Sequence, residues 1–171
     1  MTSAEVLADA FSRVRDSVHA ATEGLTPEQL SVRLDPEANT IAWLVWHLSR
    51  VQDDHVAGVA GFEQVWRASG WADRMGLAAL GDNVGYGHDS AQVAQVRSTA
   101  DELLGYYDEV HRATIRFVTQ LTDADLDGVV DETFDPPVTM GVRLVSVISD
   151  DLQHVGQAAY VRGIVERGRP A

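Results

Sequence analysis

Apolar side chains recur at helical spacing over long stretches of the chain. In residues 3–22 they fall three and four positions apart while charged residues occupy the other faces, which predicts an amphipathic helix. A second helix is expected to begin at Asn39 or Thr40, both suitable N-caps, and to end near Gly58 or Gly61. Its first half, TIAWLVWHLSRV, is apolar almost all round. We therefore expect this helix to be buried between neighbouring helices.

Two further helices are expected at residues 90–121 and 140–165, where apolar residues keep the same spacing. Between them, Pro136 and Pro137 block helix formation. The connection at residues 66–90 is long, rich in Gly and Trp, and has no clean period. Connections of this length are uncommon in compact domains and are often functional. Four long helices with little strand signal predict an all-α four-helix bundle with long connections.

Composition is consistent with one helical domain over residues 1–171. The chain is 45% hydrophobic and 23% charged, which is ordinary for a globular protein of a length that supports a full core. No charged-then-apolar leader stands at the N-terminus, and the longest apolar run, residues 41–46, is far too short to cross a membrane. We expect a cytoplasmic protein that does not act at a membrane.

The charge and the missing residue types exclude several chemistries. The formal net charge of -13 disfavours nucleic acid and anionic membranes as partners, since both attract basic surfaces. The chain contains no cysteine, which excludes disulfides, thiolate-held zinc, iron–sulfur clusters and a cysteine nucleophile. All 13 basic residues are Arg, so Schiff-base chemistry on a lysine is excluded as well. Any thiol chemistry must use a thiol from a cosubstrate.

Three side chains form the main candidate site. Asp150 and His154 are four residues apart in the fourth helix and project from one face, a common way to hold one metal ion. His47 lies in the middle of the most apolar helix, where an imidazole needs a hydrogen-bond partner or a metal. Two histidines and one carboxylate suit zinc, and also nickel, manganese or Fe(II), and three protein ligands leave a position open for catalysis. Asp151, three residues before His154, is a rival ligand.

Simpler interpretations stand beside this one. A lone histidine such as His47 is more often a satisfied core residue, and an Asp150–His154 pair is more often a surface contact. Residues 123–134 resemble a calcium-binding loop, but the twelfth position, which requires a bidentate Glu, is Phe134. A short capped helix followed by a turn is the better prediction there.

Longer sequence segments carry a family resemblance. TIAWLVWHLSRVQDDH, together with FDPPVTMGVRLVSVISDDLQHVGQAAYVRG and VGYGHDS, resembles the DinB/YfiT-like metalloenzyme superfamily over essentially the whole chain. Within it, the chain is similar to the actinobacterial mycothiol S-transferases and to the metal-binding domain of mycothiol-dependent maleylpyruvate isomerase. The resemblance implies a four-helix bundle with one divalent metal, usually zinc, whose first ligand is His47 and last is His154. Asp150 stands where many members have His and where the isomerase has a carboxylate.

The resemblance also implies an activity. A divalent-metal-dependent S-transferase would activate mycothiol, a sugar thiol, as the thiolate that attacks an electrophilic substrate, with detoxification as its role. Because the sequence ends at Ala171 without a further domain, S-transfer is preferred to maleylpyruvate isomerisation. The alternatives are a non-catalytic metal-binding module in stress response, closed by His55 or His88, and a metal-dependent hydrolase. Asp54, Gln157 and Tyr160 lie where they could support the ligands. A homodimer through exposed helix faces is compatible with the sequence.

Overall fold

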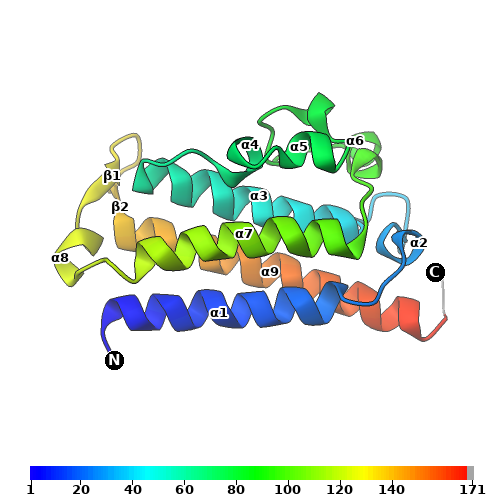
Figure 1. The fold of residues 1–171 in the computed structure, drawn as a ribbon, viewed down its shortest axis with the longest axis horizontal. Coiled ribbons are helices and arrows are strands. Elements are labelled where there is room, and N and C mark those ends of the chain that lie inside the picture. Colours follow the sequence, from blue (N-terminus) through cyan, green and yellow to red (C-terminus); the bar gives the residue numbers. More distant parts are fainter. Residues whose placement is uncertain (169–171) are drawn as a thin grey trace.

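Four long helices form the body of the molecule. The computed structural model describes residues 1–168, and within them the long helices lie side by side as a bundle (Figure 1): α1 (Ser3–Thr22), α3 (Ile41–Ala60), α7 (Ala100–Val118) and α9 (Met140–Glu166). The colour gradient of Figure 1 shows that α1 and α9 run in one direction and α3 and α7 in the other. The prediction of an all-α four-helix bundle is confirmed.

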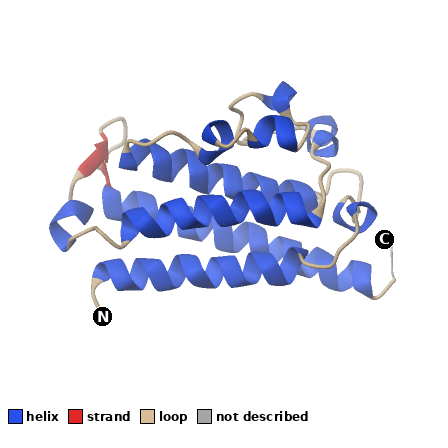
Figure 2. Cartoon of the chain, in the orientation of Figure 1, coloured by secondary structure: helices blue, strands red, loops and turns tan. Residues whose placement is uncertain are grey.

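Short elements fill the connections. The two strands pair antiparallel beside the start of α9 and are the only strands in the described part of the chain (Figure 2). The short elements are α2 (Pro27–Leu30), α4 (Val65–Ala68), α5 (Trp71–Arg74), the 3-10 helix η1 (Ala78–Leu80), α6 (Ser90–Gln95), α8 (Asp123–Leu126), β1 (Val129–Asp131) and β2 (Val138–Thr139).

Each long helix begins at a threonine. Thr2, Thr40, Thr99 and Thr139 all have extended backbones, and each hydroxyl accepts a hydrogen bond from the N–H three residues later. Such a cap pairs one of the N–H groups that the first turn leaves without a partner, which fixes where the helix starts. Helix α3 ends at Gly61, whose φ of 74° places it in the left-handed region, so both predicted limits of this helix are confirmed.

The expectation of one continuous helix over residues 90–121 is wrong. Helix α6 ends at Gln95, the backbone turns extended at Val96, and α7 begins only at Ala100. The reason is a capping box, in which Thr99 and Glu102 satisfy each other's backbone N–H groups and start a new helix. The predicted short helix after residue 122 is confirmed as α8, which Thr122 caps in the same way.

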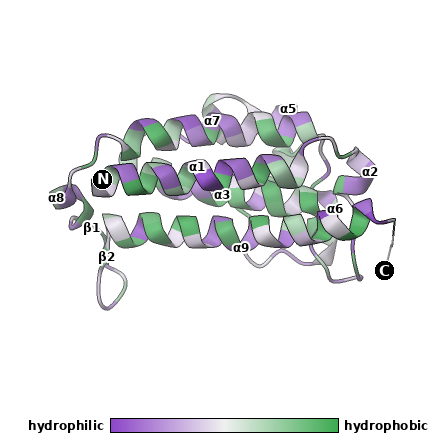
Figure 3. Ribbon diagram, turned by 90° about the horizontal axis from the view of Figure 1, so that it is seen from below, coloured by the Kyte–Doolittle hydropathy of each residue, from purple (hydrophilic) through white to green (hydrophobic). Residues whose placement is uncertain are grey.

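The bundle core is built around α3. Its side chains are buried on all faces over residues 41–53, as the apolar sequence predicted. Trp66 and Trp71, from the connection after α3, are also buried and extend this core outward. Figure 3 shows polar and apolar residues alternating along α1 and α7, the pattern of helices with one face in the core. No helix among the described residues has the length and apolar character that crossing a membrane requires.

Candidate metal centre

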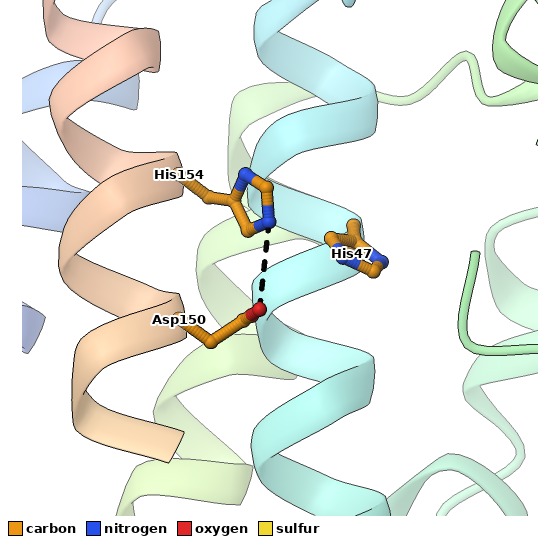
Figure 4. Close-up of side chains that lie close together, drawn as sticks. All are labelled: His47, Asp150 and His154. Carbon is orange, nitrogen blue, oxygen red and sulfur yellow. Dashed lines mark ion pairs between the residues drawn. The ribbon is translucent and has the colours of Figure 1, made fainter. Parts of the chain in front are cut away.

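The structure brings His47, Asp150 and His154 together between α3 and α9. One ligand atom from each side chain lies within 4.8 Å of those from the other two. The His154 Nε2 is 3.6 Å from an Asp150 carboxylate oxygen, and the centroids of the two imidazole rings are 4.7 Å apart. Figure 4 shows Asp150 and His154 projecting from successive turns of α9 toward α3, where His47 lies. This is the two-histidine, one-carboxylate group that the sequence predicted.

His47 is held in one protonation state. Its side chain is buried, and Nδ1 lies 2.5 Å from the backbone carbonyl oxygen of Val84. A carbonyl can only accept, so Nδ1 carries the proton and Nε2 keeps the lone pair that a metal requires. Burial also lowers the pKa of His47, which favours the neutral ring despite the opposing effect of the Val84 carbonyl. Trp43 stacks on the imidazole, with ring centroids 4.6 Å apart.

Asp150 and His154 each have a buried polar atom without a partner. These atoms are Asp150 Oδ2 and His154 Nδ1, on side chains that are about one-fifth exposed. Buried polar atoms are normally hydrogen-bonded, so unpaired ones at a single place call for an explanation. A divalent cation can pair with the free Asp150 oxygen, and it would take His154 through Nε2, the nitrogen that lies 3.6 Å from this carboxylate, rather than through Nδ1. Imidazole nitrogen and carboxylate oxygen are the donors that zinc, nickel and manganese accept. The residues present therefore fit such an ion.

The rival Asp151 lies elsewhere. Its side chain is completely buried in the core, it does not belong to the group formed by His47, Asp150 and His154, and neither of its oxygens has a hydrogen-bond partner. Burial raises the pKa of Asp151 well above its ordinary value, and the charge of Asp150 raises it further. The geometry thus favours Asp150 over Asp151 as the acidic member of the site.

The two other candidate histidines remain outside the group. His55 lies 3.2 Å from the carboxylate of Asp54 through its Nδ1. His88 accepts a hydrogen bond from the indole N–H of Trp43 at 3.1 Å and stacks on Trp46. Within the described residues, neither one joins the three potential ligands.

A loop covers His47, and a buried arginine holds it. The completely buried Arg50 donates to the carbonyl of Asp82 at 3.1 Å, and the indole of Trp66 donates to the carbonyl of Gly81 at 2.9 Å. Asp53 lies 3.6 Å from the Arg50 guanidinium and accepts the backbone N–H of Trp66 at 2.8 Å. These contacts fix the start of the loop that delivers Val84 to His47.

Sequence reasoning missed this support. Arg50 and Asp53 stand one helical turn apart in the most apolar helix, a spacing that indicates an internal ion pair. The partner of His47, in contrast, is a backbone carbonyl. Every residue type has a backbone carbonyl, so the sequence could not indicate that Val84 is the partner of His47.

Gly85 lets the loop approach closely. Its φ of 104° lies where L side chains are strained, and a Cβ built there would stand 2.6 Å from Nδ1 of His47. The rings of Trp46 and Trp43 would lie 3.1 and 3.2 Å from the same Cβ. Glycine is therefore required both by the backbone and by the space beside His47.

Fold and site together define a helical bundle with a candidate metal centre between two of its long helices. The family model described as the DinB superfamily matches residues 10–158, and the chain belongs to this superfamily. A crystal structure of the conserved protein of locus from Enterococcus faecalis is similar, with 24% identity, 99% of each chain covered and a TM-score of 0.90. This likeness shows the fold. No curated protein matches the sequence significantly.

Proposed function

We propose that the protein is a divalent-metal-dependent thiol S-transferase, with zinc held by His47, Asp150 and His154. The observation that carries the proposal is the meeting of these three side chains, one of which, Asp150, has a carboxylate oxygen without a partner. A hollow of about 220 Å³ reaches Asp150 from the surface, so a small molecule can approach the group. Three protein ligands leave room for an exogenous one, which is typical of catalytic rather than structural sites.

The chain's own residues prepare the site. When bound, a divalent cation lowers the pKa of a coordinated thiol and favours its thiolate. The Val84 carbonyl fixes the tautomer of His47 and so leaves Nε2 with the lone pair that would hold the ion. Trp43 stacks on the His47 ring and Tyr86 meets it edge to face, so both rings help to hold the imidazole in place. Since the sequence has no cysteine, the thiol must come from a second substrate.

Mycothiol is the proposed thiol, on the strength of the family resemblance. With 1-chloro-2,4-dinitrobenzene as a model electrophile, the thiolate sulfur attacks the carbon that bears chlorine. The new C–S bond forms, the C–Cl bond breaks, and chloride leaves with the electron pair. The proton of the thiol passes to the buffer, so the reaction is a substitution that needs no oxidant or reductant.

The test is turnover of this electrophile by protein loaded with zinc, nickel or manganese, with and without mycothiol. We expect turnover that requires both metal and thiol and is lost in His47→Ala. His19→Ala is the matched control, because His19 contacts Asp108 and does not belong to the site. Absence of turnover with all three metals contradicts the proposal. Turnover of ester substrates without thiol would favour the metal-dependent hydrolase instead.

A further inference from the structure

Hollows line the seam between α3 and α9 on both sides of Gln153. The first, of about 220 Å³, is lined by Asp150, Ser146, Ser149 and Gln153, and meets a further hollow of about 370 Å³ at His55. The second, of about 480 Å³, also contains Gln153 but extends along α9 in the other direction. The candidate metal group thus lies on a seam with space toward either end of the bundle.

The two directions differ in chemistry. Beyond Asp150, the first hollow is lined by Ser146 and Ser149 as well as by Val51 and Tyr86, and its continuation contains the Asp54–His55 pair. The second hollow is lined by aliphatic side chains and by Tyr160, which is 68% exposed, together with the amides of Asn39, Gln153 and Gln157. Its aliphatic members are Ala38, Leu44 and Val161. The first hollow, with its serines, Asp150 and His55, is therefore the more polar of the two, and the second offers more aliphatic surface.

We propose that the two substrates occupy different hollows, with the polar body of the thiol beside Ser146 and Ser149 and the apolar body of the electrophile beside Tyr160. This inference rests on the proposed S-transfer. The thiol sulfur has to reach the metal ligands, and of the two hollows only the first is lined by one of them, Asp150. The electrophile needs only to reach the sulfur, and Gln153 lines both hollows.

Two helical glycines allow the second hollow and the continuation of the first to be filled separately. Gly156 lines the second hollow, and Gly58 lines the continuation of the first. A Cβ built on either glycine meets no heavy atom within 4 Å, so a side chain can begin at either position without a clash. Leucine is also a better helix former than glycine, which argues against unfolding of the variants. Gly156→Leu and Gly58→Leu are therefore controls for each other.

Steady-state kinetics should separate the two variants. In Gly156→Leu the KM for chlorodinitrobenzene should rise about tenfold or more, while the KM for mycothiol stays within about twofold of the parent. Gly58→Leu should show the opposite pattern. Both variants should bind zinc like the parent, because neither glycine lies in the ligand group. Equal KM values in parent and variants would overturn the assignment of the hollows while leaving S-transfer intact.

A binding measurement keeps the inference testable without turnover. 1,3-Dinitrobenzene has the same apolar body but no leaving group, and its binding to metal-free protein can be followed by tryptophan quenching. Binding that is weakened in Gly156→Leu and unchanged in Gly58→Leu supports the second hollow as the electrophile site. Binding that is equal in all three proteins, or lost only in Gly58→Leu, contradicts it. Absence of turnover by the parent would instead count against the proposed function itself.

Discussion

Replacing Gly85 with alanine tests how the loop over α3 positions His47. The added Cβ would stand 2.6 Å from Nδ1 of His47, the atom that donates to the Val84 carbonyl. Ring and methyl group cannot both keep their places, so either the loop lifts or the imidazole turns. In both cases the hydrogen bond between His47 and Val84 is lost.

The size of the effect follows from two contributions. An L residue held at positive φ costs about 1–2 kcal/mol relative to glycine. A lost hydrogen bond that leaves a buried group unpaired costs a further ~1–3 kcal/mol. We therefore expect Gly85→Ala to lower the free energy of unfolding by about 3 kcal/mol. Because the lost bond orients a metal ligand, zinc affinity should fall about 10–100-fold as well.

Gly87→Ala is the matched control. Gly87 lies in the same loop with a φ of 72°, but a Cβ there meets nothing within 4 Å. This variant should show the backbone cost alone, about 1–2 kcal/mol, with unchanged zinc affinity. Urea unfolding measures the stabilities, and calorimetric zinc titration measures the affinities. If Gly85→Ala and Gly87→Ala bind zinc equally well, the loop does not position His47 and the reasoning is refuted.

Three further predictions concern acidic and basic side chains in and around the candidate metal centre. Asp150→Asn should lower zinc affinity at least about tenfold, whereas Asp151→Asn should leave it unchanged. Calorimetric titration with zinc measures both affinities, and the reverse result would make Asp151 the ligand. Burial raises the pKa of Asp151 above its ordinary value of 3.8. As the pH rises above 3.8, the Asp151 carboxyl therefore stays protonated in the folded state but loses its proton in the unfolded state. The free energy of unfolding should fall over this pH range. Urea unfolding at several pH values should show this decline reduced in Asp151→Asn, and an unchanged slope would contradict it. Arg50→Met leaves the buried Asp53 without its cation and should lower the unfolding free energy by about 3–5 kcal/mol; a loss below about 1 kcal/mol in urea unfolding would refute this.

Much of the fold could be predicted because the long helices carry their own signals. The spacing of apolar residues located α1, α3 and α9. Thr40 and Gly61, which cap α3 at its two ends, also marked the limits of that helix. The break before α7 was also encoded, in the capping pair of Thr99 and Glu102, but continuous apolar spacing on both sides concealed it. Local capping prevailed there over helical periodicity.

The site could be predicted only in part, for a similar reason. Helical spacing brings Asp150 and His154 to one face, but residues three and four positions away share that face, so spacing alone could not separate Asp151 from Asp150. Packing separates them, since Asp151 turns into the core and Asp150 toward His47. The apolar residues of the loop that covers His47 show no regular spacing, and the loop contacts His47 through the backbone carbonyl of Val84. Neither feature could be predicted from residue types.

Metal content tests the central claim most directly. Purified protein, incubated with excess zinc and then dialysed, should hold about one equivalent of zinc by elemental analysis, since the site offers three ligands to a single ion. His47→Ala and His154→Ala should each lose it, while His19→Ala retains it. A parent that holds no zinc, or variants that hold as much as the parent, would contradict a metal centre at His47, Asp150 and His154.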